Sequence, residues 1–381
     1  MAGIIHPARG LSGETEAIIQ IDRVAAHPMC LGAVGLPDLH PGKGGPVGMA
    51  ALFQKPIPAL LGNDVGCGFS LFALDIKPKK LVDVARLTER LTEAALDEPG
   101  KVFSDLLMGH AHDGSLGTVG GGNHFVEIQR VHAADAASGI AEGQALLLVH
   151  SGSRALGEEV FRRMAAQHGE RPLEEFAAWL AEHDFLVEWA RRNRIALARR
   201  TAEALGCQHE LVLDLPHNFV ERTPQGFLHR KGASPADRGF SVLPGSRGTP
   251  TFLLAPAVDA CARLSLNSLP HGAGRRIARG AARSVSRDPE EFRVSPPLIK
   301  GGQGAIAICG DRDLLVEERP GAYKDVRAVL GGTEDAGLAR LLAEFHPLVT
   351  FKCGGSREAA RDRTRGRDAK TASRERRDNR R

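Results

Sequence analysis

The chain is organised around a short run of residues that reads Gly62-Asn63-Asp64-Val65-Gly66-Cys67-Gly68. Its three glycines permit positive φ angles and close backbone approach, so the run is expected to form a shaped loop rather than a helix or strand interior. Asp64 and Cys67 lie three residues apart, and both side chains can point at one cation. The pair also has ordinary interpretations, because aspartate is common in turns and a lone cysteine packs as a small hydrophobic residue.

The composition is that of an ordinary globular protein. The 381 residues are 42% hydrophobic and 25% charged, which is enough to build a sizeable core in one large domain or two intimate ones. No apolar run approaches the ~20 residues of a membrane-spanning helix, and the N-terminus has no signal-peptide pattern. Six cysteines without a pairing rhythm favour free thiols in a reducing compartment. The sequence therefore predicts a cytoplasmic protein that is not attached to a membrane.

The charge is distributed unevenly and suggests a domain boundary. Residues 354–381 contain eleven Lys or Arg and five Asp or Glu, a net charge of +6, whereas the whole chain carries +4. This tail has no aromatic residue and is predicted to be disordered, which leaves residues 1–353 as the folded domain. Two interpretations of the tail stay open: an electrostatic arm for RNA or another polyanion, and a solvated extension without a task.

Short apolar runs between glycines and prolines predict strands at residues 46–53, 69–74, 145–149 and 211–215. Helical periodicity predicts helices at residues 79–96, at least two within 155–206, and others at 276–286 and 332–345. Strands dominate outside residues 155–206, and no regular strand–helix alternation occurs. This pattern is typical of an α+β fold.

Three histidines stand in unusual settings. His150 and His217 each follow an apolar strand, and His124 follows a glycine cluster. A single histidine at a strand end is usually structural, but three such residues fit metal ligands better, because imidazole is the commonest metal ligand. With Asp64 and Cys67 they form a mixed S, N and O set that suits Zn²⁺, Co²⁺, Mn²⁺ or Fe²⁺, and affinity order alone favours Zn²⁺.

A fourth histidine, His271, is expected to be an exposed imidazole in a glycine-rich turn. Several loops offer backbone N–H groups and basic side chains that are suited to bind phosphate near His271. These loops comprise residues 37–45, 229–233 and 243–249. The surface beside His271 can therefore accept a phosphate close to a nucleophile.

Nine segments together resemble one family. PDLHPGKG, GNDVGCG, GGGNHFVE, VHSGSR, PHNFVE, HRKGA, LPGSRGT, PHGAGR and AYKDV occur in the order found in the RtcB-type RNA ligases, across about residues 30–352. The resemblance implies packed mixed or antiparallel sheets, flanked by helices, around a central metal site. It also implies a GTP- and Mn²⁺-dependent ligase that joins RNA 3′-phosphate or 2′,3′-cyclic phosphate ends to 5′-hydroxyl ends, in tRNA splicing or RNA repair. A monomer is expected.

The resemblance also implies roles for individual residues. Cys67 would bridge two Mn²⁺ ions, with His124 and His150 completing one site and Asp64 and His217 the other. His271 would be the catalytic nucleophile that becomes guanylylated. The residues implied to bind the guanylate are Asn123, Glu127, His217, Asn218, Pro244, Gly245, Ser246, Arg247, Thr251, His271, Gly272, Ala273, Gly274, Tyr323 and Lys352. Residues in motifs at the rim of the site are Asp38, His229, Arg230 and Lys231.

The chain departs from the family pattern at a few positions. Family chains usually end near a Lys-Gly, whereas Lys352 is followed by Cys353 and the basic tail. Arg247 and Thr251 stand where an apolar residue and a serine are expected, so the contacts to the nucleobase are expected to differ. Two alternative functions are a metal-dependent phosphodiesterase or phosphatase acting on RNA ends and a non-catalytic RNA-binding homologue. Neither needs a nucleophilic His271.

Overall fold

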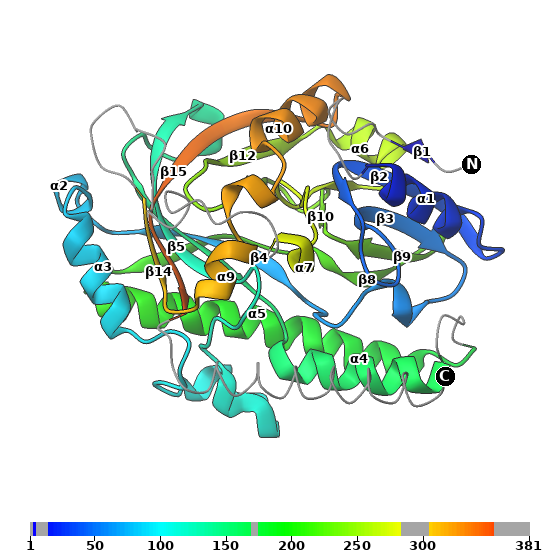
Figure 1. Cartoon of the computed structure of the whole chain (residues 1–381), viewed down its shortest axis with the longest axis horizontal. Coiled ribbons are helices and arrows are strands. Elements are labelled where there is room, and N and C mark those ends of the chain that lie inside the picture. The colour runs from blue at the N-terminus through cyan, green and yellow to red at the C-terminus, as the bar shows by residue number, and fades with distance from the viewer. Residues whose placement is uncertain (1–2, 5–13, 169–173, 283–304, 354–381) are drawn as a thin grey trace.

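The computed structural model describes residues 3–4, 14–168, 174–282 and 305–353, which form sheets flanked by helices (Figure 1). The largest sheet has eight strands, and all its pairs are antiparallel except the parallel pair of β14 and β15. In spatial order its strands are β11 (Ser241–Pro244), β12 (Thr251–Pro256), β15 (Ala339–Cys353), β5 (Phe125–Ala134), β6 (Ala145–Ser151), β4 (Gly68–Leu74) and β7 (His209–Pro216), with β14 (Ile306–Cys309) also paired to β15.

A second sheet has five strands, and a third has two. The order of the five-stranded sheet is β1 (Gly3–Ile4), β2 (Cys30–His40), β3 (Val47–Phe53), β9 (Gly226–Lys231) and β8 (Asn218–Thr223). The small sheet pairs β10 (Ala233–Pro235) with β13 (Ser268–Pro270). Since β1 is parallel to β2 and the other pairs are antiparallel, the predicted fold of mixed and antiparallel sheets with flanking helices is confirmed.

Helices cover the sheets in a pattern that Figure 1 makes visible. The long α5 (Ala177–Leu205) packs against β4, β6 and β7, and α3 (Val84–Glu93) lies against both α5 and β15. Over the five-stranded sheet lies α1 (Glu14–Ala25), and α10 (Val326–Asp335) contacts β15 and β2. The remaining described helices are α2 (Pro78–Leu81), α4 (Arg154–His168), α6 (Val258–Leu264), α7 (Arg279–Ala282) and α9 (Arg312–Glu317), with short 3₁₀ turns η1 (Pro58–Leu60), η2 (Ser104–Leu106), η3 (Ala111–Ser115), η4 (Ala136–Ser138) and η5 (Pro320–Ala322). No helix in these residues is both long and apolar enough to span a membrane.

Strand direction gathers the predicted metal ligands at one edge of the large sheet. Because β4 is antiparallel to both β6 and β7, its first residue, Gly68, lies opposite Ser151 and Pro216 at the ends of those strands. The first residue of β5, Phe125, likewise lies opposite His150. The residues just before β4 and β5 and those at the ends of β6 and β7 must therefore meet.

Most elements predicted from local patterns are present. The four predicted strands correspond to β3, β4, β6 and β7, and the region 155–206 holds α4 and α5. The single helix expected at residues 79–96 is instead divided into α2 and α3, because the Asp83 side chain accepts the N–H of Arg86 and starts a new helix there. Part of the loop expected at residues 37–45 belongs to β2. Of the helix expected at 276–286, residues 276–282 are described, and only residues 279–282 are helical, as α7 (Arg279–Ala282). The tail 354–381 lies outside the described residues.

The predicted helix at residues 332–345 is wrong. Helix α10 ends at Asp335, and Gly337, with φ of 66°, donates its N–H to the Glu334 carbonyl. The following residues form β15, which pairs with β12, β5 and β14. Ala, Leu and Glu favour helices only weakly, so pairing on both sides of the strand outweighs their propensity.

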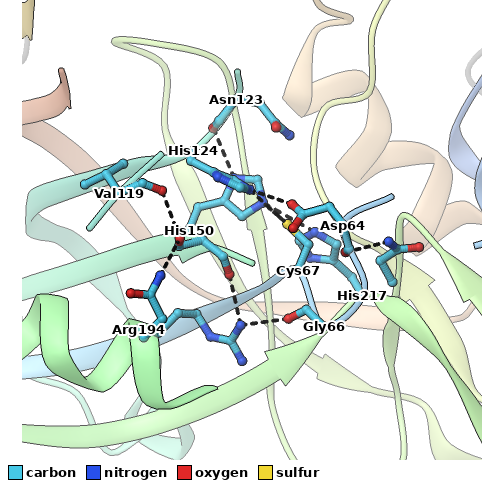
Figure 2. Close-up of polar contacts among 12 residues, drawn as sticks. Asp64, Gly66, Cys67, Val119, Asn123, His124, His150, Arg194 and His217 are labelled. Atoms are coloured by element: carbon cyan, nitrogen blue, oxygen red, sulfur yellow. Dashed lines mark hydrogen bonds and ion pairs between the residues drawn. The ribbon is translucent and has the colours of Figure 1, made fainter. Parts of the chain in front are cut away.

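One buried arginine joins helix α5 to the loop that contains Asp64 and Cys67. The Arg194 side chain is 0% exposed, and its guanidinium contacts the Asp214 carboxylate at 2.9 and 3.0 Å. It also donates to the carbonyl oxygens of Gly66 at 2.9 Å and Ser151 at 3.0 Å (Figure 2). Arg194 therefore holds the loop before β4 and the end of β6 in fixed positions relative to α5.

We expect Arg194→Ala to lower the free energy of unfolding by about 3–5 kcal/mol, because Asp214 loses its partner and two buried carbonyl groups lose their donor. The measurement is guanidinium unfolding followed by circular dichroism. Arg191→Ala is the matched control on the same helix, since Arg191 is partly exposed and only pairs with Glu188 at 3.6 Å; its cost should stay below about 1 kcal/mol. Equal effects of the two substitutions would show that the buried contacts carry little stability.

Candidate metal and nucleotide site

Five predicted metal ligands meet at the edge of the large sheet. The Cys67 sulfur lies 3.2 Å from His150 Nε2 and 3.4 Å from His124 Nε2. His150 Nε2 lies 3.3 Å from His217 Nε2, and His124 Nε2 lies 2.8 Å from an Asp64 carboxylate oxygen. Figure 2 shows these side chains pointing toward one another. The donor atoms of Cys67, His124 and His150 all lie within 4.8 Å of one another, a spacing that can hold a metal ion.

Backbone contacts fix the protonation of His150. Its Nδ1 lies 3.1 Å from the Asn123 carbonyl oxygen, which can only accept, so Nδ1 carries the proton. The lone pair on Nε2 is then directed at Cys67 and His217. In a metal-binding histidine, the ring nitrogen that does not contact the metal usually donates its proton to a carbonyl or carboxylate group. Burial and the neighbouring histidines lower the pKa values of His150 and His217, which keeps both imidazoles in the neutral form that metals bind.

The remaining chemistry of the cluster also fits a cation. Burial, together with the nearby Asp64 carboxylate, raises the pKa of the Cys67 thiol well above its usual value. Burial also raises the pKa of Asp64, but the adjacent His124 and Arg154 outweigh it and hold that pKa below its usual value. The buried Nδ1 atoms of His124 and His217 have no hydrogen-bond partner. A metal ion bound among the Asp64 carboxylate and the neutral imidazoles of His150 and His217 would stabilise the Cys67 thiolate, which burial alone disfavours.

The loop carrying Asp64 and Cys67 has the predicted shape. It connects η1 to β4 without regular structure, and Gly66 has a φ of 78°. A Cβ atom there would lie 2.8 Å from the Cα atom of Val187 in α5, so only glycine fits this close approach. The Asn218 side chain donates to the Asp64 carbonyl at 2.6 Å, and His217 N donates to the Cys67 carbonyl at 2.8 Å. These bonds join the loop to the segment between β7 and β8.

His271 lies beside this cluster, immediately after β13. Its ring centroid is 4.8 Å from that of His217, and its Nδ1 lies 2.6 Å from an Asp38 carboxylate oxygen. The same oxygen accepts the backbone N–H of His271 at 3.1 Å. A carboxylate can only accept, so Nδ1 carries the proton and Nε2 carries the free lone pair. The expectation of an exposed imidazole is wrong: the side chain is only 13% exposed, because Asp38 on the buried strand β2 holds it inward.

The turn after His271 fits closely against the same strand. Gly274 has a φ of 70°, and a Cβ atom there would overlap the Asp38 carbonyl oxygen. Lys324 donates its backbone N–H to the Gly274 carbonyl at 3.0 Å and its ammonium to the Leu39 carbonyl at 2.7 Å. Ala273 N donates to the Pro244 carbonyl at 3.0 Å, which joins the turn to the loop after β11.

A pocket of about 1260 Å³ contains both the metal cluster and His271. Four of the five predicted metal ligands line it, and His124 lies behind Asp64 and Cys67. Of the residues implied to bind guanylate, those that line the pocket are Asn123, Glu127, His217, Asn218, Pro244, Gly245, Ser246, Arg247, His271, Gly272, Ala273, Gly274, Tyr323 and Lys352. Thr251 is the exception. It is 1% exposed and lies behind the wall, where its hydroxyl accepts a hydrogen bond from Gln129 at 2.8 Å.

The wall next to Gln129 contains buried charges. Glu127 accepts hydrogen bonds from Gln129 at 2.7 Å and from Thr350, and burial raises the pKa of its carboxyl group. Lys352 is 4% exposed and donates to the His124 carbonyl at 3.2 Å. Burial lowers the pKa of its ammonium.

Sequence reasoning missed the partners of Tyr323. Its hydroxyl donates to the buried Glu318, which also forms an ion pair with Arg275 at 3.1 Å. Arg279 lies 3.6 Å from the same carboxylate and donates to the Asn123 side chain at 3.2 Å. Glu318 and Arg275 stand 43 positions apart, and no local pattern connects them.

The residues assigned to the rim take different positions. Lys231 lines the pocket and donates to the Lys43 and Gly45 carbonyls at 2.5 and 3.0 Å; burial lowers its pKa to about 8. His229 and Arg230 are 0% exposed and do not line the pocket. His229 accepts the N–H of Ile57 at 2.9 Å, and Arg230 pairs with Glu221 at 2.5 Å.

Comparisons with known proteins show the family of the chain. The family model described as tRNA-splicing ligase RtcB matches residues 20–105 and 101–353. The RNA-splicing ligase RtcB2 of Escherichia coli is 36% identical over 366 residues, covering 91% of this chain and 94% of its own. The tRNA-splicing ligase RtcB of Nanoarchaeum equitans is 26% identical, covering 89% of this chain and 92% of its own. The match spans nearly all of the described residues, including every residue of the metal cluster and His271, and the chain belongs to the RtcB family.

Proposed function

We propose that this chain joins RNA 3′-phosphate or 2′,3′-cyclic phosphate ends to 5′-hydroxyl ends, using GTP and two Mn²⁺ ions. The observation that carries the proposal is the position of His271, whose Nδ1 is held by Asp38 while its ring lies against His217 in the pocket of the metal cluster. The RNA-ligase names of its relatives support an RNA substrate. We propose that the biological role of this reaction is tRNA splicing or RNA repair in the cytoplasm, as the sequence suggested.

His271 supplies the nucleophile in the first step. Its Nε2 lone pair attacks the α-phosphate of GTP, so that a P–N bond forms and pyrophosphate leaves. Asp38 keeps the ring in one orientation and stabilises the charge that develops on it, as the acidic member of a catalytic triad does. Because both side chains are nearly buried, the nucleophile is already positioned before GTP binds.

The metal cluster lies where the triphosphate would be held. Asp64, Cys67, His124, His150 and His217 would hold the two ions, with Cys67 bridging them. When bound, Mn²⁺ neutralises phosphate charge and favours departure of pyrophosphate. The basic residues that line the pocket include Lys43, Arg247 and Arg279, and their charges would attract the phosphates of both GTP and RNA.

The later steps use the same pocket. Water first opens a 2′,3′-cyclic phosphate to a 3′-phosphate, breaking the bond from phosphorus to the 2′-oxygen. Guanylate then passes from His271 to the RNA 3′-phosphate as the P–N bond breaks, and the 5′-hydroxyl attacks that phosphate and releases GMP. Guanine presents both hydrogen-bond donors and an acceptor. The Glu127 carboxylate and the Lys352 ammonium face the pocket from adjacent strands, β5 and β15. The carboxylate can accept hydrogen bonds from the guanine donors, and the ammonium can donate to the guanine acceptor. This arrangement supports GTP as the nucleotide.

We expect His271→Ala to remove all transfer of ³²P from α-labelled GTP to the protein, because no other side chain replaces the Nε2 nucleophile. Asp38→Asn should still be labelled, but about 10²–10⁴-fold more slowly, since the amide cannot hold the imidazole in the same state. His132→Ala is the control, because His132 is exposed on β5 and does not line the pocket. A labelled His271→Ala protein would exclude the proposed nucleophile, and an unlabelled wild-type protein would favour the phosphodiesterase or RNA-binding alternatives.

We expect Cys67→Ala to remove both Mn²⁺ ions and His150→Ala to weaken chiefly one, because only Cys67 is shared by both sites. Equilibrium dialysis with elemental analysis measures the number of ions bound. Cys261→Ala is the control, since this thiol is buried away from the pocket and donates to the Leu338 carbonyl. Two ions bound normally by the Cys67→Ala protein would contradict the bridging role.

A further inference from the structure

Two cysteines that the proposed mechanism does not use lie side by side at the end of the large sheet. Cys309 is the last residue of β14, and Cys353 is the last residue of β15. They are direct partners across this parallel pair of strands, and their sulfur atoms are 3.6 Å apart. Cys353 is buried, whereas Cys309 is partly exposed. Neither side chain lines the pocket.

The pair lies at an irregularity that places Lys352 in the pocket. Ile308 is paired with Phe351 and Cys309 with Cys353, so Lys352 is an extra residue without a partner on β14. Such a β-bulge redirects a side chain. Lys352 lines the pocket and donates to the carbonyl of His124. The cysteine pair therefore lies directly beside the β-bulge that places Lys352 in the pocket.

The surroundings of Cys353 favour a reactive thiolate. The Cys309 thiol hydrogen-bonds to it, and backbone groups of Asp311 and Gly310 do the same. The hydrogen bond from Cys309 is the main reason that the pKa of Cys353 is lowered. The thiolate is the nucleophilic form of cysteine, and Cys309 is in place to resolve an oxidised Cys353 sulfur.

We propose that Cys309 and Cys353 form a redox switch, in which a hydroperoxide oxidises the pair to a disulfide that clamps the bulge at Lys352 and weakens binding of the nucleotide. The proposed effect of oxidation on nucleotide binding rests on the proposed GTP-dependent function, whereas disulfide formation itself does not.

The oxidation balances with one hydroperoxide. The Cys353 sulfur attacks one peroxide oxygen, an S–O bond forms, the O–O bond breaks, and, with hydrogen peroxide, the leaving hydroxide takes a proton to become water. The Cys309 sulfur then attacks the sulfenic acid, an S–S bond forms, the S–O bond breaks, and the second oxygen leaves as water with the thiol proton. Two thiols lose two electrons, and the peroxide gains them.

We expect closure of the disulfide to pull on the end of β15. The sulfur atoms would approach from 3.6 Å to about 2.05 Å, the length of an S–S bond. Strand β14 would draw Cys353 toward itself and carry the neighbouring Lys352 away from β5. A displacement of about 1 Å can cost two orders of magnitude where a positioned group is needed, so we expect GTP affinity to fall at least about tenfold.

The first experiment maps the bond in the full chain. The reduced protein is treated with hydrogen peroxide, free thiols are blocked by alkylation, and peptides are analysed by mass spectrometry. We expect a Cys309–Cys353 crosslinked peptide that disappears after dithiothreitol, is absent from both Cys309→Ser and Cys353→Ser, and persists in the control Cys207→Ser. Overoxidised but uncrosslinked Cys353, or a metal ion held by the two thiols in place of the crosslink, would overturn the inference.

The second experiment measures binding of guanosine 5′-(α,β-methylene)triphosphate, which cannot transfer guanylate, by calorimetry in the presence of Mn²⁺. We expect affinity to fall at least about tenfold in the oxidised wild-type protein, to recover with dithiothreitol, and to stay constant in Cys309→Ser under the same treatment. An equal loss in Cys309→Ser would place the oxidation elsewhere, such as at Cys67, and would overturn the switch, as would unchanged affinity in the crosslinked protein. Failure of the reduced protein to bind the analogue would instead overturn the GTP-dependent function and, with it, the proposed effect of oxidation on nucleotide binding, while the crosslink would still decide the dithiol chemistry.

Discussion

The contacts of the Cys67 sulfur with His124 and His150 set the geometry on which the rest of the site depends. Cys67 and His124 directly precede strands β4 and β5, and His150 lies near the end of β6. These residues meet only because neighbouring strands run in opposite directions. A register shift of one residue in any of these strands would turn a ligand to the other face of the sheet. The hydrophobic residues that fix the register, such as Leu147 and Val149 in the fully buried β6, therefore also fix the metal cluster.

Around this cluster the protein buries many charged groups, and each is held by specific partners. Arg194 is paired with Asp214, Glu318 with Arg275, and His271 with Asp38. Such pairs add little to stability compared with hydrophobic packing of similar volume, but removing one partner leaves an uncompensated charge. Their value here is positional, because a charge held by two or three hydrogen bonds has one orientation. The proposed binding of a triphosphate and RNA ends would need several fixed charges, and the surrounding β-sheets supply rigid positions for them.

The sequence was most informative where the signal was local. The strands that carry His150 and His217 were identifiable from short apolar runs, and the loop of Asp64 and Cys67 from its glycines. Long-range contacts gave no such signal: nothing near residue 38 indicates that Asp38 would hold His271 inward, and nothing near Arg194 indicates that its guanidinium would reach the loop before β4. The first part of strand β15, up to Phe345, was predicted as a helix because its composition favours helices, and only pairing with β5 and β12 makes it a strand. Membership of the RtcB family was visible in the order of the motifs, whereas placement of each side chain needed the fold.

His217 is the single residue between β7 and β8, where the chain passes from the eight-stranded sheet to the five-stranded one. Its imidazole belongs to the metal cluster, its N–H is donated to the carbonyl of Cys67, and its own carbonyl accepts the N–H of Ala233. The two sheets cannot separate at this point without pulling a ligand from the cluster. Binding of a metal ion to this cluster would therefore be linked thermodynamically to the contact between the two sheets, and it would raise the free energy needed to separate them.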